Sequence, residues 1–192
     1  MNISIVNVGD EILAGDTVNT NATWLAERLD ERGAEVKRIV VIPDEVDVIA
    51  STVREHSQEY DAVIVTGGLG PTHDDVTMDG VARAFGKEVR ESQEALRAIR
   101  KQYSNKDLAE KTAHLPEGSR PLTNSVGVAP GCVIENVFVL PGVPKEMKKM
   151  FELIEDQFGG QERHTAFLRT ETPESEMVDL LEEVQDRFGV TV

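Results

Sequence analysis

Thr66-Gly67-Gly68-Leu69-Gly70-Pro71-Thr72-His73-Asp74-Asp75-Val76-Thr77 joins an apolar run to a segment of helical character. The apolar run, residues 62–66, is rich in β-branched side chains, as buried parallel strands are. The amides of a glycine-rich turn, with the helix start that follows, can form a cradle for an anion. The turn is not a P-loop, because no Gly-Lys-Ser/Thr follows it, and it is not the Gly-x-Gly-x-x-Gly dinucleotide fingerprint. We therefore expect an anion-binding turn after a buried strand.

A second polar turn follows the first predicted strand. Residues 2–8 are β-rich and lead into Gly9-Asp10-Glu11. A helix is then expected from about Asn21 to Arg32, where Gly33 ends it. Asn19, Thr20 and Asn21 are all candidates for its N-terminal cap.

A further strand and helix, at about 35–42 and 45–58, precede the strand at 62–66. Three strands that are each followed by a helix imply a parallel sheet with right-handed crossovers. Both polar turns, 9–16 and 67–75, directly follow strands, so we expect them at the same edge of the sheet. Open α/β sheets bind their ligands at that edge.

The rest of the chain is less regular, and residues 119–131 predict either an ordered functional loop or an excursion of short strands. The other elements expected before residue 159 are helices at 77–85 and 91–103, a hairpin at 132–140 that turns at Glu135-Asn136, and a helix at 145–158 with Pro144 at its first position.

Gly159-Gly160 is the expected boundary between two units, residues 1–158 and residues 161–192. The second unit is too small for a core of its own. It is expected to form a β-α-β appendage with a strand at 164–171, a helix at 174–188 and a strand at 189–192. The end at Thr191-Val192 leaves two alternatives, an appendage that is cut short or a tail that packs differently.

The charge balance excludes some classes of partner. The chain has 192 residues, with 35 Asp+Glu against 20 Lys+Arg and a net charge of −15. Nucleic-acid backbones and anionic membranes attract basic faces, so neither is expected as a partner. The single cysteine, Cys132, and the lack of an apolar run near the roughly 20 residues of a membrane helix predict a cytoplasmic protein. The acidity itself fits salt adaptation or an ordinary acidic enzyme equally well.

Paired carboxylates occur in both turns, and each pair has two interpretations. Asp10 and Glu11 suit a hard cation, although Asp10 alone can also close an Asx turn. Asp74 and Asp75 suit a divalent cation that bridges carboxylate and phosphate. Alternatively, Asp75 or Thr77 caps the helix that follows.

Five motifs in order give the sequence a family resemblance. Gly9-Asp10-Glu11-Ile12, Asn19-Thr20-Asn21 and the turn at 66–77 together resemble the molybdopterin-binding-like domain family, and Gly127–Gly131 and Leu140–Met147 continue the match. Relatives in molybdenum-cofactor synthesis carry Gly-Gly-Thr-Gly in the turn. Leu69 and the Pro-Thr-x-Asp-Asp continuation instead resemble the N-terminal domain of competence/damage-inducible CinA proteins.

The resemblance covers roughly residues 1–158 and implies a three-layer α/β/α domain with a mostly parallel sheet. It implies a hydrolase that cleaves the diphosphate of ADP-ribose or a similar dinucleotide such as FAD, with Mg²⁺, Mn²⁺ or Co²⁺. The alternative is a module that binds molybdopterin or a nucleotide without turnover. A homodimer or homotrimer is expected, since relatives form both. The amidohydrolase domain of bacterial CinA is absent, so deamidation is not expected.

The resemblance also implies the site residues. The expected catalytic residues are Asp75, Asp74 and Glu11, and the expected metal ligands are Asp10 and Asp75. Thr112 stands where relatives often carry glutamine, which puts that contact in doubt. The expected ligand-binding residues are Gly9, Asp10, Asn19, Asn21, Thr66, Gly67, Gly68, Gly70, Pro71, Thr72, Thr77, Gly127, Pro130, Gly131, Pro141 and Gly142.

Overall fold

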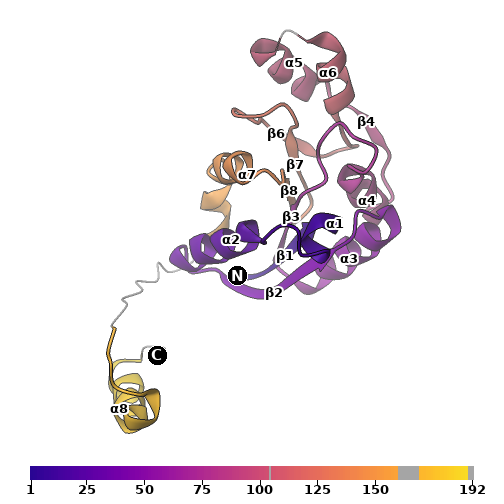
Figure 1. Ribbon diagram of the computed structural model, residues 1–192. Coiled ribbons are helices and arrows are strands. Elements are labelled where there is room, and N and C mark those ends of the chain that lie inside the picture. The colour runs from indigo at the N-terminus through magenta and orange to yellow at the C-terminus, as the bar shows by residue number, and fades with distance from the viewer. Residues whose placement is uncertain (104, 160–168, 190–192) are drawn as a thin grey trace.

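The computed structural model describes residues 1–103, 105–159 and 169–189 (Figure 1). Within these residues the main sheet has six strands in the order β2-β1-β3-β8-β7-β6. Neighbouring strands among the first four run parallel, whereas β7 and β6 are added antiparallel. The predicted mostly parallel sheet is therefore confirmed. Its strands are β1 (Asn2–Val8), β2 (Glu35–Ile42), β3 (Ala62–Thr66), β6 (Arg120–Leu122), β7 (Gly131–Ile134) and β8 (Val137–Leu140).

Side chains on the two faces of the sheet enter two separate cores, which gives the predicted three layers. Along β1, Ile3 and Ile5 belong to one core and Val6 and Val8 to the other, because successive side chains of a strand point to opposite faces. The first core also holds α2 (Thr20–Glu31), α7 (Pro144–Phe151) and the 3-10 turn η1 (Glu155–Phe158). The second holds α3 (Val46–Glu59), α4 (Thr77–Ala84), α5 (Gln93–Gln102) and α6 (Lys106–Thr112).

The segment between α4 and β6 contains more structure than the sequence predicted. The helix expected at 91–103 is α5, and a second helix, α6, follows it. Ser92 and Asn105 cap these helices by accepting bonds from Ala95 N and Leu108 N, at 3.3 and 3.2 Å. Two short strands, β4 (Val89–Glu91) and β5 (His114–Pro116), pair antiparallel in a sheet of their own. Strands of three residues carry too little periodicity to be seen in sequence.

Several predicted bounds also change. The helix expected at 145–158 ends at Phe151, and η1 covers its last turn. The polar turn after β1 contains a short helix, α1 (Asp10–Leu13). The hairpin at 132–140 is confirmed as β7 and β8, with Glu135 at φ 50° in the turn.

The C-terminal segment contains the 3-10 turn η2 (Glu174–Glu176) and the helix α8 (Val178–Phe188). Gly189 ends α8 in the left-handed conformation. The helix predicted at 174–188 is thus present, but most of the strand expected at 164–171 and the end of the chain lie outside the described residues. The division into two units stays a prediction. Among the helices that the structure describes, none is long and apolar enough to cross a membrane.

Candidate functional site

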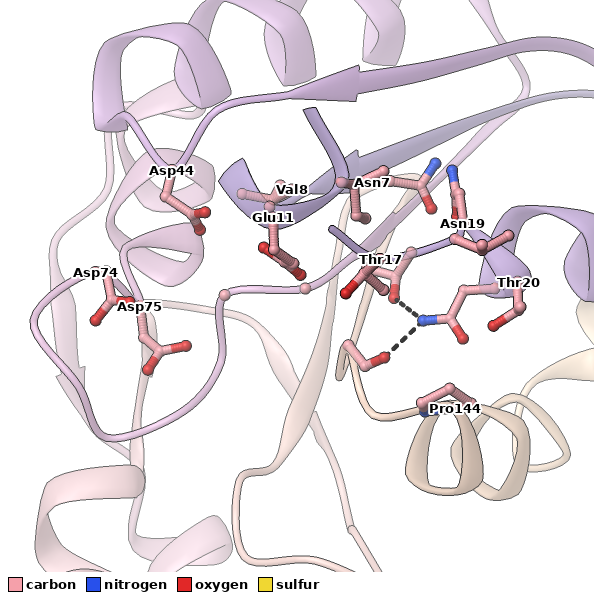
Figure 2. A pocket seen from close by; sticks show the side chains of 18 residues that line it. Asn7, Val8, Glu11, Thr17, Asn19, Thr20, Asp44, Asp74, Asp75 and Pro144 are labelled. Carbon is pink, nitrogen blue, oxygen red and sulfur yellow. Dashed lines mark hydrogen bonds between the residues drawn. The ribbon is translucent and has the colours of Figure 1, made fainter. Parts of the chain in front are cut away.

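A cavity of about 300 Å³ opens at the carboxyl edge of the sheet (Figure 2). Its walls come from the end of β1, α1 and the start of α2, from the residues after β2 and β3, and from the turn between β8 and α7. The strand register explains why these pieces meet. Val8 pairs with Ile42, Asn7 with Thr66, and Thr66 with Leu140, so all four parallel strands end at one level. The two polar turns predicted at the same edge do lie together.

Gly67 and Gly68 allow the second turn to pass close to the first. Both have positive φ, at 111° and 61°. A Cβ on Gly67 would overlap the carbonyl oxygen of Val8, and one on Gly68 would overlap the hydroxyl of Thr77. The glycines at these two positions are therefore required by backbone conformation and by close packing together.

The amide cradle is smaller than the sequence suggested. Gly67 N donates to Leu140 O at 3.2 Å, and Gly70 N and Thr72 N donate to the carboxylate of Asp75 at 2.7 and 2.9 Å. In the described part of the chain, the amides of Gly68 and Leu69 have no acceptor. These two amides, next to each other in the turn, are free to meet an anion.

Asp75 holds its own loop. Oδ1 accepts from Gly70 N, and Oδ2 accepts from both the amide and the hydroxyl of Thr72. This bonding ties the end of the loop back to Gly70 and Thr72, which precede Asp75 in the chain. The predicted capping role is wrong, because the N-cap of α4 is Val76 and no side chain bonds to it.

Asp44 is a candidate site residue that was not predicted from the sequence. It lies just after β2, lines the cavity, and its Oδ2 accepts from Asp10 N at 2.9 Å. Burial raises the pKa of Asp44, and the charges of Asp10, Glu11 and Asp74 raise it further, against the lowering effect of the Asp10 amide. Ligands of parallel sheets bind beyond the carboxyl ends of the strands, and this rule applies to β2 as it does to β1 and β3. The position of Asp44 just after β2 could therefore have identified it.

Three of the four carboxylates predicted from the two turns line this cavity. Glu11, Asp74 and Asp75 line it with Asp44, as the sticks in Figure 2 show, whereas Asp10 is not among the lining residues. Among the described residues, no group of three or more His, Cys, Asp or Glu is placed to hold a metal ion. Of the predicted pair of metal ligands, Asp75 lines the cavity and Asp10 does not, and their role in binding a metal stays a prediction.

A neutral polar region lies at the other end of the cavity. Asn21 Nδ2 donates to Gly142 O at 2.7 Å and to Thr66 Oγ1 at 3.2 Å, and Thr66 Oγ1 donates to Pro141 O at 2.9 Å. Asn7 Nδ2 donates to Val40 O at 3.1 Å. These donations fix both amide orientations, and the Oδ1 atoms of Asn7 and Asn21 are left buried without a partner. Buried acceptors are normally hydrogen-bonded, and a ligand can supply the missing donor.

Several expected ligand-binding residues lie away from this cavity. Gly127 is fixed by Asn124, whose Oδ1 accepts its amide at 2.7 Å. Gly131 lies in β7, where a Cβ would overlap Val139 O and the sulfur of Met150. Gly70, Pro71, Thr72 and Pro130 line a second cavity, on the far side of the turn. Gly9, Asn19, Asn21, Thr66, Gly67, Gly68 and Gly142 do line the first cavity, and their roles remain predictions.

Comparison with known proteins gives a consistent family assignment. A family model described as "Probable molybdopterin binding domain" matches residues 4–158. A protein of Archaeoglobus fulgidus is 45% identical over 184 residues, which cover 96% of this chain and 80% of that protein. A protein of Pyrococcus horikoshii is 40% identical over 207 residues, covering 98% and 81%.

Solved structures agree with the sequence comparisons. CinA from Thermoplasma acidophilum, described as having unknown function, superposes with a TM-score of 0.78 at 40% identity and covers 83% of this chain and 100% of its own. The molybdopterin biosynthesis enzyme MoaB from Thermus thermophilus has a TM-score of 0.54 at 20% identity, covering 80% and 88%. The second likeness supports the fold alone.

Proposed function

This chain belongs to the molybdopterin-binding domain family, and from that premise we propose that it hydrolyses the diphosphate of a dinucleotide such as ADP-ribose or FAD with a divalent cation. One observation carries the proposal. The carboxylates of Asp44, Glu11 and Asp74 and the free amide of Gly68 line one end of a cavity whose other end has neutral acceptors, and the free amide of Leu69 follows in the same turn. A nucleotide has the matching order of groups, with phosphates at one end and hydroxyl and amino donors at the other.

The residues present fit a cation that is shared with the ligand. Mg²⁺ in proteins is commonly held by one or two carboxylates together with substrate phosphates and water, so a site of three protein groups is not required. Asp44 and Glu11 would hold it, with Asp74 nearby. This assignment replaces Asp10 and Asp75, because the oxygens of Asp75 are already bonded within their loop. When bound, the cation polarises phosphoryl oxygens and makes water a stronger nucleophile.

The protein's own groups bind and orient the substrate. The amides of Gly68 and Leu69 donate to a phosphate oxygen, and the Oδ1 atoms of Asn7 and Asn21 accept from the nucleoside. Water adds to one phosphorus, the bridging P–O bond breaks, and two phosphate monoesters leave with the released protons.

A turnover assay tests this proposal. Wild-type protein is incubated with ADP-ribose or FAD and Mg²⁺, Mn²⁺ or Co²⁺, and the monoesters are measured by ³¹P NMR. We expect Asp44→Asn to lower the rate on the order of a hundredfold. Glu45→Gln is the matched control, since Glu45 is adjacent and exposed but does not line the cavity. No turnover with any cation, or full activity in Asp44→Asn, overturns the proposal.

Cation binding has a readout without turnover. A ligand at about a hundred times its Kd stabilises the native state by about 2.7 kcal/mol, or roughly 5–10 °C for a domain of this size. Saturating Mg²⁺ with AMP is expected to raise the Tm of wild type and of Glu45→Gln. It should raise the Tm of Asp44→Asn much less.

The second candidate function is a pterin-binding module without turnover. The unpaired oxygens of Asn7 and Asn21 favour it, because a pterin also presents amino and amide donors. Calorimetry with molybdopterin and with nucleotides separates the two candidates. If molybdopterin binds and nucleotides do not, the module is preferred, and if neither binds tighter than millimolar it is rejected.

A further inference from the structure

The segment between β1 and α2, residues 10–18, lies outside the hydrophobic cores of the protein. Eight of its nine residues are exposed, Ile12 is half-buried, and none belongs to either core. The segment is anchored at its two ends, where Gly9 N donates to Ile42 O at 3.1 Å and Asn19 caps α2. We call residues 10–18 the flap.

The hydrogen bonds of the flap are almost all internal. Ala14 N donates to Asp10 O at 2.8 Å, and other amides of the flap donate to carbonyls of residues 9–12. Among the described residues, the bond from Asp10 N to Asp44 is the one that joins the flap to a part of the chain outside residues 9–20. A segment with no fully buried side chain and one such bond opens at little cost in free energy.

The flap nevertheless contributes to both ends of the first cavity. Glu11 lies on the side of Asp44, and Thr17 lies on the side of Asn19 (Figure 2). Ile12 and Val18 line the cavity as well. We propose that the flap closes over a bound nucleotide, with Ile12 and Val18 packing against its base. This inference rests on the proposed hydrolysis of nucleotides and adds the residues that recognise the base.

The exposure of Val18 is the first argument for contact with a base. Val18 is 80% exposed although it lines a cavity, so a ligand there would remove its apolar surface from water. Ile12 and Pro144 add apolar surface to the same lining. The buried Oδ1 atoms of Asn7 and Asn21 lack a donor in this cavity. A nucleobase combines apolar faces with donors at its edge, which matches this set of groups.

The internal bonds of the flap are the second argument, because they connect contact with the base to the cation. Glu11 O accepts the amides of Asp16 and Thr17, at 2.9 and 3.1 Å. The backbone of Glu11 is thus tied to the residues just before Val18. When Val18 moves onto a base, Glu11 moves with it. Since Glu11 is a proposed ligand of the cation, a base in the cavity positions a carboxylate that holds the cation.

Hydrogen exchange followed by mass spectrometry tests the closure without turnover. The amides of Ala14, Asp16 and Thr17 are bonded inside the flap, so their exchange reports its opening. We expect AMP with Mg²⁺ to slow this exchange about tenfold or more, because a ligand that binds the closed flap stabilises it. Ribose 5-phosphate with Mg²⁺ has the phosphate but no base, and should slow it less than about twofold.

Two substitutions in the flap separate contact with the base from a general effect on the segment. Val18→Ser removes an apolar side chain from the cavity and should weaken AMP about tenfold in calorimetry, with ribose 5-phosphate within about twofold. Leu13→Ser is the matched control, since Leu13 is 53% exposed on the same flap but does not line the cavity. It should change neither affinity by more than about twofold. Both side chains are exposed, so we expect both variants to fold.

The outcomes separate this inference from the proposed function. If AMP binds but protects the flap no more than ribose 5-phosphate does, the inference is overturned. Equal affinity of wild type and Val18→Ser for AMP overturns it as well. In both cases hydrolysis of the diphosphate by wild type stands on its own assay. Failure of AMP itself to bind overturns the inference together with the proposed function.

Discussion

The main-chain amide of Asp10 donates a 2.9 Å hydrogen bond to Oδ2 of Asp44, which joins the start of α1 to the residue after Pro43. Two segments of the chain separated by more than thirty positions thus meet where carboxylates already gather. The bond stabilises a negative charge that burial and three other acids oppose. The net effect is a raised pKa for Asp44, so a nearby cation would relieve an unfavourable negative charge at this position.

Asp44→Asn is expected to make the protein more stable at neutral pH. Burial and neighbouring charge raise the pKa of Asp44 in the folded state. The charged form of Asp44 therefore lowers the stability of the folded state. This cost is absent below the ordinary pKa near 4 and is complete once the pH has risen above the raised value. Asparagine removes that cost, and we expect a gain of roughly 0.5 kcal/mol, or about 1–2 °C in Tm, at pH 7.

Thermal unfolding at pH 7 and pH 4 measures this gain. It should shrink at pH 4, because the raised pKa makes the folded protein bind a proton at Asp44 more readily as the pH falls, which removes the unfavourable charge. A variant that is less stable than wild type at both pH values would contradict the account. Higher stability together with lost turnover is the pattern expected of a functional residue.

Gly67→Ala is expected to be severely destabilising. Gly67 has φ 111°, and an added Cβ would overlap the carbonyl oxygen of Val8 in the backbone of β1. We expect a loss of more than about 3 kcal/mol in the free energy of unfolding. Gly15→Ala is the matched control, since Gly15 also has positive φ, 79°, but no atom within 4 Å of the added Cβ. It should cost only about 1 kcal/mol. Urea denaturation gives both values, and equal losses would show that strain alone matters.

His56 should make stability depend on pH below neutrality. It is 2% exposed, and its Nδ1 lies 2.7 Å from the hydroxyl of Ser4. Burial, then the charge of Arg38, lowers the pKa of His56, against the opposite effect of Glu55 and Glu59. The unfolded chain therefore binds a proton first, and stability falls as the pH drops below about 6.5.

The loss should reach up to about 1 kcal/mol between pH 6.5 and 5.5. Urea unfolding across that range measures it. His56→Gln cannot titrate and should give a nearly flat profile there, although its absolute stability is lower. A wild-type profile that is equally flat would show that the folded and unfolded pKa values of His56 agree.

The sequence predicted those parts of the fold that depend on local pattern. Residues 62–65 are all apolar because both faces of β3 are buried, and this pattern allowed the strand to be predicted. The strands β4 and β5 exist only through pairing with each other, so no local pattern reveals them. The site divides in the same way, since Asp75 was found by motif but Asp44 depends on where β2 ends beside β1. The three bonds that hold Asp75 within its loop depend on how the loop folds, which no local sequence pattern reveals.

Asn21→Asp is expected to destabilise the protein although the two side chains have the same shape. Asn21 Nδ2 donates to Gly142 O and Thr66 Oγ1, and a carboxylate has no proton to donate to either. Gly142 O would face a buried negative charge, at a cost of about 2–4 kcal/mol. Asn19→Asp is the control, because Asn19 caps α2 through its oxygen, which accepts from Ala22 N at 3.2 Å, and aspartate caps equally well. Its effect should stay within about 0.5 kcal/mol in urea unfolding at pH 7. A similar loss in both variants would contradict the assignment of Asn21 Nδ2 as the donor and of its Oδ1 as the atom left for a ligand.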